Sequence, residues 1–533
     1  MNTSAQCIGR AVLGLSALGL VLWCASPSYG GVDTYRWGEP VQLAGEQCFL
    51  NKILFDSDGN ALVFIGSLHE YMPGYYDYND VIRRYDVQTE TWQDPEVASV
   101  QFEAGYYWWT PVGQVATVAI DPQGNMALMF PSLLPDINYR YLAITSYEVG
   151  VGWTTTPVLI ELVGYTRWFE SLNMGADSLG NFVELHEIDS RVFTSVCPAG
   201  THGQGWSSPP DELSTIGAQA SLLATIIQNP SGTALYALYM TADTPYTGYQ
   251  LYAHRFNSSS VAWGAGEALP GASDCTCAFG NGVAFLRGVV DEAGEATVFF
   301  EKEESGVTWL CASRTDQGVW QSPTYLLQVD CATGMEYWGN ATVNAAGDVT
   351  GITPAYVNGT HGVYSVTYRN GTGWEAPQSL PIDAESVSSV RLATFGAGEA
   401  VASLNNPDRV FTSAYHDGSD WDGELDVAGD WTADRQECGG NGERVLLVYE
   451  ARDSDFVDQG IWAAWLVQDT HGDMNCDGVV NNFDISPFVL AVTDPVAYAA
   501  AYPECDILNG DCNGDGVVNN FDISPFVGLL VEP

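Results

Sequence analysis

Short apolar runs separated by glycine turns recur along residues 31–470. In the first unit, Ile53-Leu-Phe-Asp-Ser-Asp-Gly59-Asn-Ala-Leu-Val-Phe, an apolar run of strand length stands on each side of the turn. Glycine supplies the positive φ that the tip of a hairpin requires, and a preceding Asp or Asn hydrogen-bonds the turn. Each such turn predicts a β-hairpin. Similar turns surround Gly124, Gly180, Gly232, Gly294, Gly347, Gly398 and, with a weaker match, Gly442.

A second series, of tryptophans, alternates with the glycine turns. Its members recur every 47 to 61 residues: Trp37, Trp92, Trp153, Trp206, Trp263, Trp320, Trp374 and Trp421. Another β-prone stretch, such as residues 251–256 or 363–368, lies between each glycine turn and the next tryptophan. Each unit therefore offers four short strands, which is the content of one blade of a β-propeller. We expect the periodic tryptophans to be packing residues of the blades.

The two series are offset in a way that favours a closed ring. The tryptophan series begins with a lone unit at Trp37, and the chain's last β-prone stretches, residues 444–449 and 461–466, have no matching tryptophan unit. A strand from the start of the chain would complete the last blade and remove the open edge. The predicted fold is mostly β: a seven- or eight-bladed β-propeller of no identified family, followed by a small α-helical module. The turn count favours eight blades, and the weak last unit leaves seven open.

Two acidic loops near the end of the chain predict metal binding. Residues 473–484 and 511–522 each carry oxygen side chains at loop positions 1, 3, 5, 9 and 12 and glycine at position 6. This is the ligand order of an EF-hand calcium loop, with Asp in place of the usual Glu at position 12. We expect two calcium ions. The candidate ligands are Asp473, Asn475, Asp477, Val479 (carbonyl), Asn481 and Asp484, and then Asp511, Asn513, Asp515, Val517 (carbonyl), Asn519 and Asp522.

Both loops are followed by the same Phe-Asp-Ile-Ser-Pro-Phe-Val, and the pair resembles the duplicated F-hand repeat of type I dockerins. The resemblance covers residues 471–533. It implies a calcium-dependent module that docks onto a cohesin-like or cell-surface protein, with loop positions 10 and 11 contacting the partner. Those positions are Asn482, Phe483, Asn520 and Phe521, where dockerins often have small hydroxyl residues.

The rest of this module has a short helix and a small cysteine set. Asp494 followed by Pro495 is typical of a helix start, and the Ala-rich sequence continues the helix toward Tyr502. Pro487 and Pro525 fall in the first turn of the two helices after the loops, where proline is tolerated. A module of this size needs metal or a disulfide as a staple. The module has three cysteines, which permit three alternative disulfides. They are Cys476, Cys505 and Cys512.

The net charge limits the partners that the protein can bind, and the N-terminal segment predicts its compartment. The net charge is −48, from 18 basic and 66 acidic residues, which excludes a generic nucleic-acid surface and makes polyanionic glycans poor partners without calcium bridging. Residues 1–30 have the pattern of a secretory signal, with Arg10 before an apolar segment over 11–23. No later stretch is apolar enough to span a membrane. We therefore expect three parts, residues 1–30, 31–470 and 471–533, in a secreted or extracytoplasmic protein that is cell-surface associated if the module docks there.

An oxidising compartment favours disulfides among the remaining cysteines. The Cys-x-Cys spacing at Cys275 and Cys277, with Cys311 and Cys331 downstream, favours disulfides over a zinc site.

Residues 31–470 carry no recognisable catalytic signature. Residues 313–320 resemble a shortened Asp-box turn of sialidases, which is structural, and the arginines are scattered at about one per unit. Non-periodic aromatic residues are candidates for stacking on sugar rings. They are Tyr71, Tyr75, Tyr76, Tyr78 and the run 106–109.

Three functions fit this sequence. The first is a secreted calcium-binding protein that docks through its C-terminal module and binds a glycan or protein with its propeller, within polysaccharide breakdown. The second is a hydrolase or lyase acting on O-glycosyl bonds of polysaccharides. This expectation comes from the resemblance, because dockerin-like modules commonly occur in one chain with glycan-degrading enzymes. The third treats the repeats as an intramolecular staple. Acidic side chains converging at the central mouth would favour the second, and exposure of Phe483 and Phe521 would argue against the third.

Overall fold

The computed structural model describes two compact units, over residues 33–469 and 470–533. The described residues run from 35 to 531, with gaps at 39, 47, 73–74, 99–101, 105–116, 135–138, 155, 165–168, 202, 215–219, 243–248, 274–286, 331–338, 382–386, 388, 397–398, 407–408, 417–420, 427–431, 453–457, 469–470, 478, 504 and 514–516. The expected signal segment, the aromatic run 106–109, Cys275, Cys277 and Cys331 lie outside them. We call residues 33–469 the β unit and residues 470–533 the C-terminal module.

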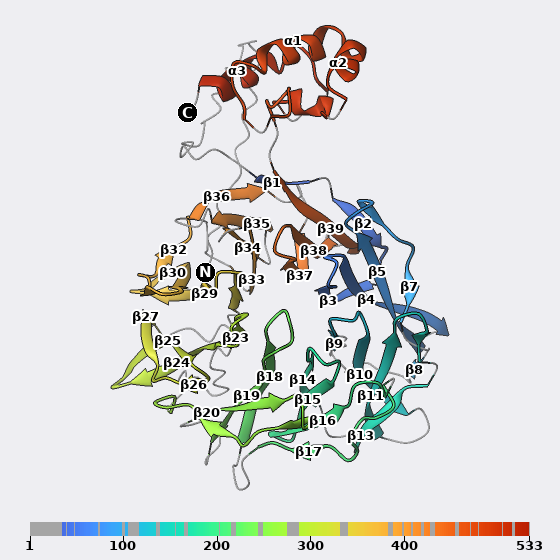
Figure 1. Cartoon of the computed structure of the whole chain (residues 1–533), viewed down its shortest axis with the longest axis vertical. Helices are drawn as coiled ribbons and strands as arrows, with labels where there is room; N and C mark the ends of the chain where they lie inside the picture. Colours follow the sequence, from blue (N-terminus) through green and yellow to red (C-terminus); the bar gives the residue numbers. More distant parts are fainter. Residues whose placement is uncertain are drawn as a thin grey trace, which may run out of the picture. The chain divides into compact units, whose positions relative to one another are not determined.

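The β unit consists of eight antiparallel sheets of four to six strands among its described residues, each running from an inner to an outer strand (Figure 1). The first four sheets in chain order comprise β3 (Cys48–Phe55), β4 (Ala61–Met72), β5 (Tyr75–Asp86), β6 (Thr91–Trp92), β7 (Glu96–Val97) and β8 (Phe102–Ala104); β9 (Thr117–Ile120), β10 (Met126–Leu134), β11 (Tyr139–Glu148), β12 (Gly152–Trp153) and β13 (Val158–Gly164); β14 (Phe169–Ala176), β15 (Phe182–Ile188), β16 (Arg191–Cys197) and β17 (Asp211–Glu212); and β18 (Ala220–Gln228), β19 (Leu235–Ala242), β20 (Gln250–Asn257), β21 (Ala262–Trp263) and β22 (Glu267–Ala268).

The remaining four sheets repeat this order. They comprise β23 (Arg287–Val290), β24 (Ala296–Glu304), β25 (Val307–Asp316), β26 (Val319–Trp320) and β27 (Thr324–Val329); β28 (Asn340–Val343), β29 (Val349–Val357), β30 (Thr360–Arg369), β31 (Gly373–Trp374) and β32 (Gln378–Ser379); β33 (Ser389–Phe395), β34 (Glu399–Asn406), β35 (Arg409–His416) and β36 (Trp421–Asp426); and β37 (Thr432–Gly440), β38 (Val445–Arg452) and β39 (Asp458–Gln468) with β1 (Tyr35–Trp37) and β2 (Val41–Ala44). Figure 1 shows the sheets arranged as a ring, which is a β-propeller-like arrangement.

The glycine turns join the first and second strands of the sheets, as predicted. In the first turn, Asp56 accepts hydrogen bonds from the backbone N–H groups of Asp58 and Asn60, and the Asn60 side chain donates back to Asp56. Asn60 also contacts the turn that follows β5, because its Oδ1 accepts a hydrogen bond from the backbone N–H of Val87. Gly398 lies outside the described residues, and the other seven glycines have positive φ: Gly59, Gly124, Gly180, Gly232, Gly294, Gly347 and Gly442.

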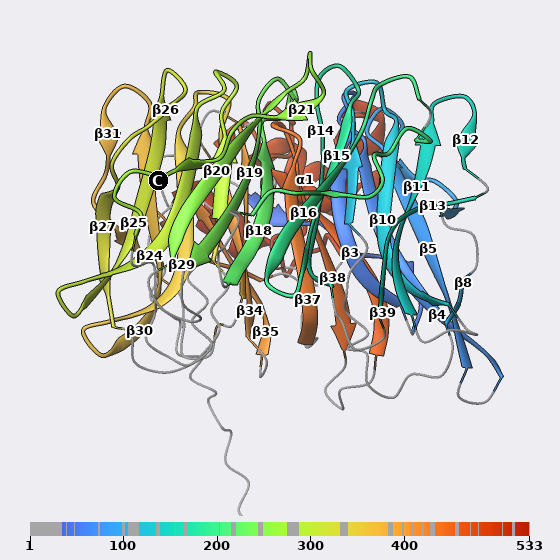
Figure 2. The same cartoon turned by 90° about the horizontal axis from the view of Figure 1, so that it is seen from below.

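The periodic tryptophans pack within and between the sheets, so this prediction is confirmed. Trp37, Trp206, Trp320 and Trp421 are buried. The half-buried Trp92 packs edge-on against Tyr85, with ring centroids 5.2 Å apart. Figure 2, a side view, shows the short strands β12, β21, β26 and β31 along one edge of the β unit. The tryptophans therefore belong to the scaffold and not to a binding surface.

The two ends of the β unit meet in one sheet. Strand β1 pairs antiparallel with β39, with Tyr35 opposite Gln468 and Trp37 opposite Leu466 (Figure 1). The N–H of Gly38 also donates to the carbonyl of Trp465. The prediction that an N-terminal strand completes the last sheet is confirmed.

The C-terminal module has three short helices and a 3-10 turn among its described residues: α1 (Ile485–Thr493), α2 (Pro495–Ala501), η1 (Ile507–Gly510) and α3 (Ile523–Val531). Asp494 caps α2 by accepting from the N–H of Ala497, as its sequence predicts. The core is small, and in it Phe488 and Phe526 stack at 4.0 Å between ring centroids. Among the described residues, no helix is long and apolar enough to cross a membrane.

Candidate functional sites

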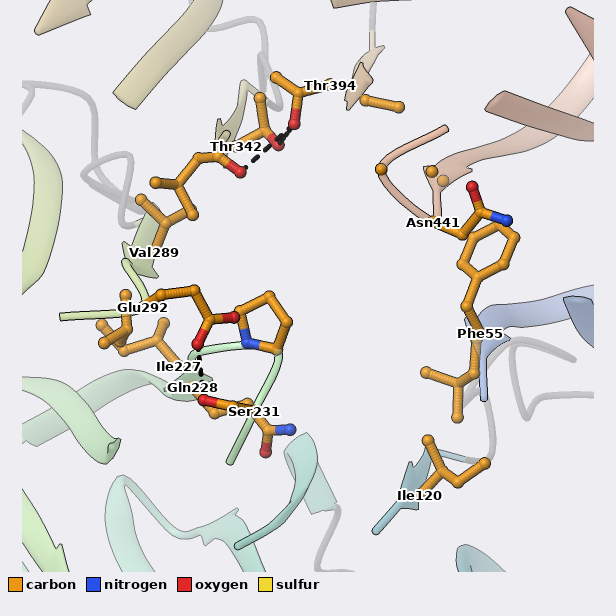
Figure 3. Close-up of a pocket in the computed structure, with 18 of the residues that line it drawn as sticks. Phe55, Ile120, Ile227, Gln228, Ser231, Val289, Glu292, Thr342, Thr394 and Asn441 are labelled. Atoms are coloured by element: carbon orange, nitrogen blue, oxygen red, sulfur yellow. Dashed lines mark hydrogen bonds between the residues drawn. The ribbon is translucent and has the colours of Figure 1, made fainter. Parts of the chain in front are cut away.

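The first candidate site is a cavity of about 910 Å³ lined by residues from the inner strands of all eight sheets and from the first turns of seven of them. Its volume lies in the range of ligand sites in proteins. Figure 3 shows its mixed wall: Phe55, Ile120, Ile227 and Val289 present apolar surface, and Gln228, Ser231, Thr342, Thr394 and Asn441 present polar groups. Apolar faces beside hydroxyl and amide groups suit a ligand with both kinds of surface, such as a sugar.

A ring of polar residues crosses the inner strands at one register, and we call it the channel ring. Its eight members are Lys52, Thr117, Asn173, Thr225, Arg287, Asn340, Arg391 and Glu437. The register follows from the ladders, because each member pairs with a second-strand residue that is at most 1% exposed. In the same order these partners are Phe64, Met129, Leu185, Leu238, Phe299, Ile352, Ser403 and Val448.

Several ring side chains reach the inner strand of the next sheet. Lys52 Nζ donates to the carbonyl oxygen of Val118 at 3.2 Å, and Asn173 Nδ2 donates to that of Ala224 at 2.8 Å. Arg287 Nε donates to the carbonyl of Gly339 at 3.2 Å, and Arg391 forms an ion pair with Glu437 at 3.1 Å. These bonds tie neighbouring sheets together around the channel.

The four charged ring members form one electrostatic cluster. Burial and, to a smaller extent, the charge of Arg391 together lower the pKa of Arg287 to about 10, against the opposing effect of Glu437. Burial also lowers the pKa of Lys52, again opposed by Glu437. Arg391 contacts Glu437 directly at 3.1 Å, and the charge of Glu437 also acts on Lys52 and Arg287, because water screens charges less here than at the surface. The scattered arginines of the sequence partly converge here, because Arg287 and Arg391 join Lys52.

The described carboxylates at the cavity wall hold the turns. Asp56 and Asp121 accept N–H groups of their own turns. Glu292 accepts a hydrogen bond from Ser231 at 2.6 Å (Figure 3). A glycosidase instead needs two carboxyl groups directed at the scissile bond.

Two carboxyl groups with raised pKa belong to other positions and to different sheets. Burial raises the pKa of Asp80 in β5 to about 7, against a hydrogen bond from Asn51, and burial raises that of Glu301 in β24 to about 7. Neither is among the residues of the cavity wall.

Three other predicted features of the β unit fall on described strands and turns. In the region resembling an Asp-box, Ser313 Oγ donates to the carbonyl of Gln321 and Trp320 is buried, which is a structural role. Cys311 is a buried thiol in β25. The four tyrosines of the predicted stacking surface lie in strands β4 and β5: Tyr71, Tyr75, Tyr76 and Tyr78.

The second candidate site is the pair of acidic loops. Asp484 is fully buried; its Oδ1 accepts the N–H groups of Met474 and Asn475, and its Oδ2 accepts that of Asn481 at 2.8 Å. In the second loop, Asp522 is buried and Asn519 N–H donates to its Oδ2 at the same 2.8 Å. Position 1, Asp473, accepts the N–H of Asp477.

The donor chemistry of these loops fits a hard cation, because each loop supplies only oxygen ligands. Among the described residues, no three His, Cys, Asp or Glu side chains already converge as a ligand group. Asn481 Nδ2 and Asn519 Nδ2 instead donate to the carbonyls of Val479 and Val517. Asp515 lies outside the described residues.

The residues predicted to contact a partner are exposed. Phe483 and Phe521 are 78% and 72% exposed, and Asn482 and Asn520 are exposed beside them. One of the three permitted disulfides is present, between Cys476 and Cys505. Large aromatic side chains therefore face solvent at equivalent positions of both copies. An intramolecular staple does not require such exposed side chains, so this exposure argues against the third function.

The channel ring was not predicted from the sequence, although the sequence contains a signal for it. Its first seven members stand seven positions before the turn glycines, from Lys52 before Gly59 to Arg391 before Gly398. Glu437 breaks the count, because its sheet has a shorter turn in which Gly440 pairs with Val445. The residue types also vary, so only the alignment of the strands brings out the common polarity.

Comparisons with known proteins give distant likenesses. No family model and no curated protein sequence matches the chain. Similar solved structures include the Dos1 propeller (8% identity, 81% of this chain and 94% of that one, TM-score 0.46) and the polysaccharide lyase Uly1 (10%, 84% and 94%, 0.43). Another is the six-bladed fucose-recognising lectin of Aleuria aurantia (12%, 59% and 94%, 0.34). These likenesses carry no ligand or activity over to this chain.

Proposed function

We propose that this chain is an extracytoplasmic glycan-binding protein that is docked to a partner through its C-terminal module. The β unit is then an eight-bladed propeller with the glycan in its central cavity. The module is a dockerin-like unit that holds two calcium ions and binds a cohesin-like or cell-surface protein. The observation that carries the docking role is the exposure of Phe483 and Phe521 at equivalent places in the two repeats.

Apolar exposure supports docking in a second way. Ile485 and Val489 in α1 have exposed counterparts, Ile523 and Val527, in α3. A protein without a partner rarely keeps so much apolar surface in contact with water. The repeated arrangement gives either copy the side chains needed for the same partner.

Calcium would be held by the two acidic loops. In the first, Asp473, Asn475, Asp477, Asn481 and Asp484 with the Val479 carbonyl supply the oxygens; the second repeats them from Asp511 to Asp522. The bound ion would supply a positive charge that neutralises the carboxylates. The chain's own part is to bury Asp484 and Asp522 and to fix them with backbone N–H groups.

Glycan binding is proposed for the cavity because its wall alternates apolar and hydroxyl groups. Thr342 and Thr394 lie 3.1 Å apart through their Oγ1 atoms, across from the ring of Phe55 (Figure 3). We propose binding and not bond cleavage, since the described carboxylates of this wall hold turns.

Calorimetry with the full chain tests docking. A cohesin domain should bind with calcium present and not with a chelator, and Phe483→Ala combined with Phe521→Ala should weaken binding at least about tenfold, as for the loss of central aromatic anchors. Val496→Ala is the control, because Val496 is 80% exposed and outside the repeats. Calcium-independent binding, or equal losses in both variants, would refute this docking surface.

An oligosaccharide panel tests the cavity. Thr394→Val should weaken binding of a neutral oligosaccharide by roughly three- to tenfold, the usual effect of one neutral hydrogen bond. Thr372→Val, on an exposed turn, should leave affinity unchanged. Binding that responds to neither variant would place the glycan elsewhere, and binding of no oligosaccharide would remove the glycan proposal.

A further inference from the structure

The two acidic loops differ at loop position 4. The first loop has Cys476 at this position, between the candidate ligands Asn475 and Asp477, and the second loop has Gly514. Cys476 is bonded to Cys505, which lies outside both loops. The disulfide therefore ties down the middle of the first loop, and the second loop cannot be tied at the same position because it has no cysteine there.

The disulfide also holds a backbone conformation that cysteine rarely adopts. Cys476 has a φ of 56°, in the left-handed region, which is disfavoured for a residue with a Cβ atom. Glycine, the residue type at position 4 of the second loop, enters this region freely. Without its bond to Cys505, Cys476 would leave this conformation more easily, so the bond restricts the first loop before any ion is bound.

In this tied loop, the oxygen atoms of several candidate ligands lie close together. Asp473 Oδ1 and Asn475 Oδ1 accept hydrogen bonds from the same group, the backbone N–H of Asp477, at 3.2 and 2.8 Å. Asp484 Oδ1 accepts the backbone N–H of Asn475 at 3.0 Å. The disulfide is therefore present in a conformation that already links loop positions 1, 3, 5 and 12.

The segment between the two loops also holds the start of the first loop. Asn509 Nδ2 donates to the carbonyl oxygen of Asp473 at 2.9 Å and lies 3.7 Å from Cys476 Sγ. The hydroxyl of the buried Tyr498 donates to the carbonyl oxygen of Met474 at 3.0 Å. These hydrogen bonds and the disulfide together fix positions 1, 2 and 4 of the first loop.

We propose that the Cys476–Cys505 disulfide positions the first loop for calcium and makes the first site the tighter of the two. This inference rests on the proposed binding of calcium by both loops and adds that the two sites are unequal. An ion that binds a loop arranged in advance causes a smaller loss of conformational entropy. Fixing one backbone residue in advance corresponds to roughly five- to thirtyfold in affinity. The first site should therefore fill at a lower calcium concentration than the second.

Calorimetric titration of the full chain with calcium chloride tests the proposal. Asp515→Ala leaves only the first site intact, Asp477→Ala leaves only the second, and the first site should bind calcium at least about fivefold more tightly. Cys476→Ser combined with Cys505→Ser should weaken the first site by roughly five- to thirtyfold and leave the second site unchanged. The two single-site variants are thus matched controls for each other.

Circular dichroism at saturating calcium shows whether each variant has folded. If a single-site variant does not fold, titration of the unaltered protein decides the question. Two binding steps of unequal affinity are then expected, and a reductant should weaken only the tighter step.

The contrary outcomes are distinct. Two sites of equal affinity, a tighter second site, or unequal sites that do not respond to the cysteine substitutions would overturn the positioning role and leave calcium binding standing. Equal weakening of both sites would show that the disulfide stabilises the module as a whole, which also overturns the positioning role. Absence of calcium binding by the unaltered protein would overturn the proposed calcium sites together with this inference.

Discussion

The two units differ in how many of their apolar side chains are exposed to solvent. Among the described residues, twelve of the twenty exposed large hydrophobic side chains belong to the short C-terminal module, and eight belong to the much longer β unit. The β unit buries whole strands, as in the fully buried run of β15, whereas the module's core has five buried apolar residues. The β unit is therefore stabilised by its own packing, whereas the module has a small core that needs a staple and leaves more of its apolar side chains exposed.

Calcium removal should produce the largest difference in stability between the two units, because only the module should lose stability. Two sites at calcium concentrations about 1,000-fold above their Kd would stabilise the module by about 4 kcal/mol each. Adding a chelator, or combining Asp477→Ala with Asp515→Ala, should abolish the calcium-dependent helicity of the module in the full chain. Circular dichroism and calorimetry measure this effect. A β-unit transition that moved equally would break the comparison.

Replacing the buried side chain of Trp37, in the strand that joins the two ends of the β unit, should lower the stability of the β unit only. Trp37 is 6% exposed, so Trp37→Ala should reduce the unfolding free energy of the β unit by about 3–5 kcal/mol. Trp92→Ala, at a half-buried tryptophan, is the control with a smaller expected loss. Chemical denaturation followed by tryptophan-independent probes measures both. Equal losses would show that closure adds nothing.

Loss of the disulfide should weaken only the module. Cys476 and Cys505 are 29 positions apart, and closing a loop of that size stabilises a chain by roughly 3 kcal/mol. Cys476→Ser combined with Cys505→Ser should lower the module's transition temperature. Adding reductant to the unaltered protein should reproduce the shift, and the double variant should not respond to reductant. A calcium-loaded module unaffected by either change would show that metal alone is a sufficient staple.

A buried carboxyl group gives the β unit a pH dependence of its own. The pKa of Asp80 is raised from 3.8 to about 7, so the folded state binds its proton more tightly than the unfolded state does. This group's contribution to stability therefore falls as pH rises from about 4 to 7 and is then constant. Relative to the unaltered protein, Asp80→Asn should gain on the order of 2 kcal/mol between pH 5 and pH 8. A constant difference across this range would contradict the shift.

The sequence predicted those parts of the fold that depend on neighbours in the chain. Glycines with positive φ, the cap at Asp494 and the closing strand at Trp37 each follow from a local signal or a repeat count. The channel ring depends on which sheet lies next to which, and the raised pKa of Asp80 depends on its burial in the folded β unit. Such relations arise between residues far apart in the chain, so no single stretch encodes them.

The pairing of β1 with β39 also constrains how the chain folds. Tyr35 and Gln468 are about 430 positions apart, so the ring stays open until almost the entire β unit has emerged. Folding that depends on such distant partners is slow, and the last sheet exposes an unpaired edge in the meantime. Once β1 has paired with β39, the first and last described strands of the β unit hold each other in one sheet, so unfolding from either end must first break this pairing. Late closure and slow opening are then two results of the same three-residue strand.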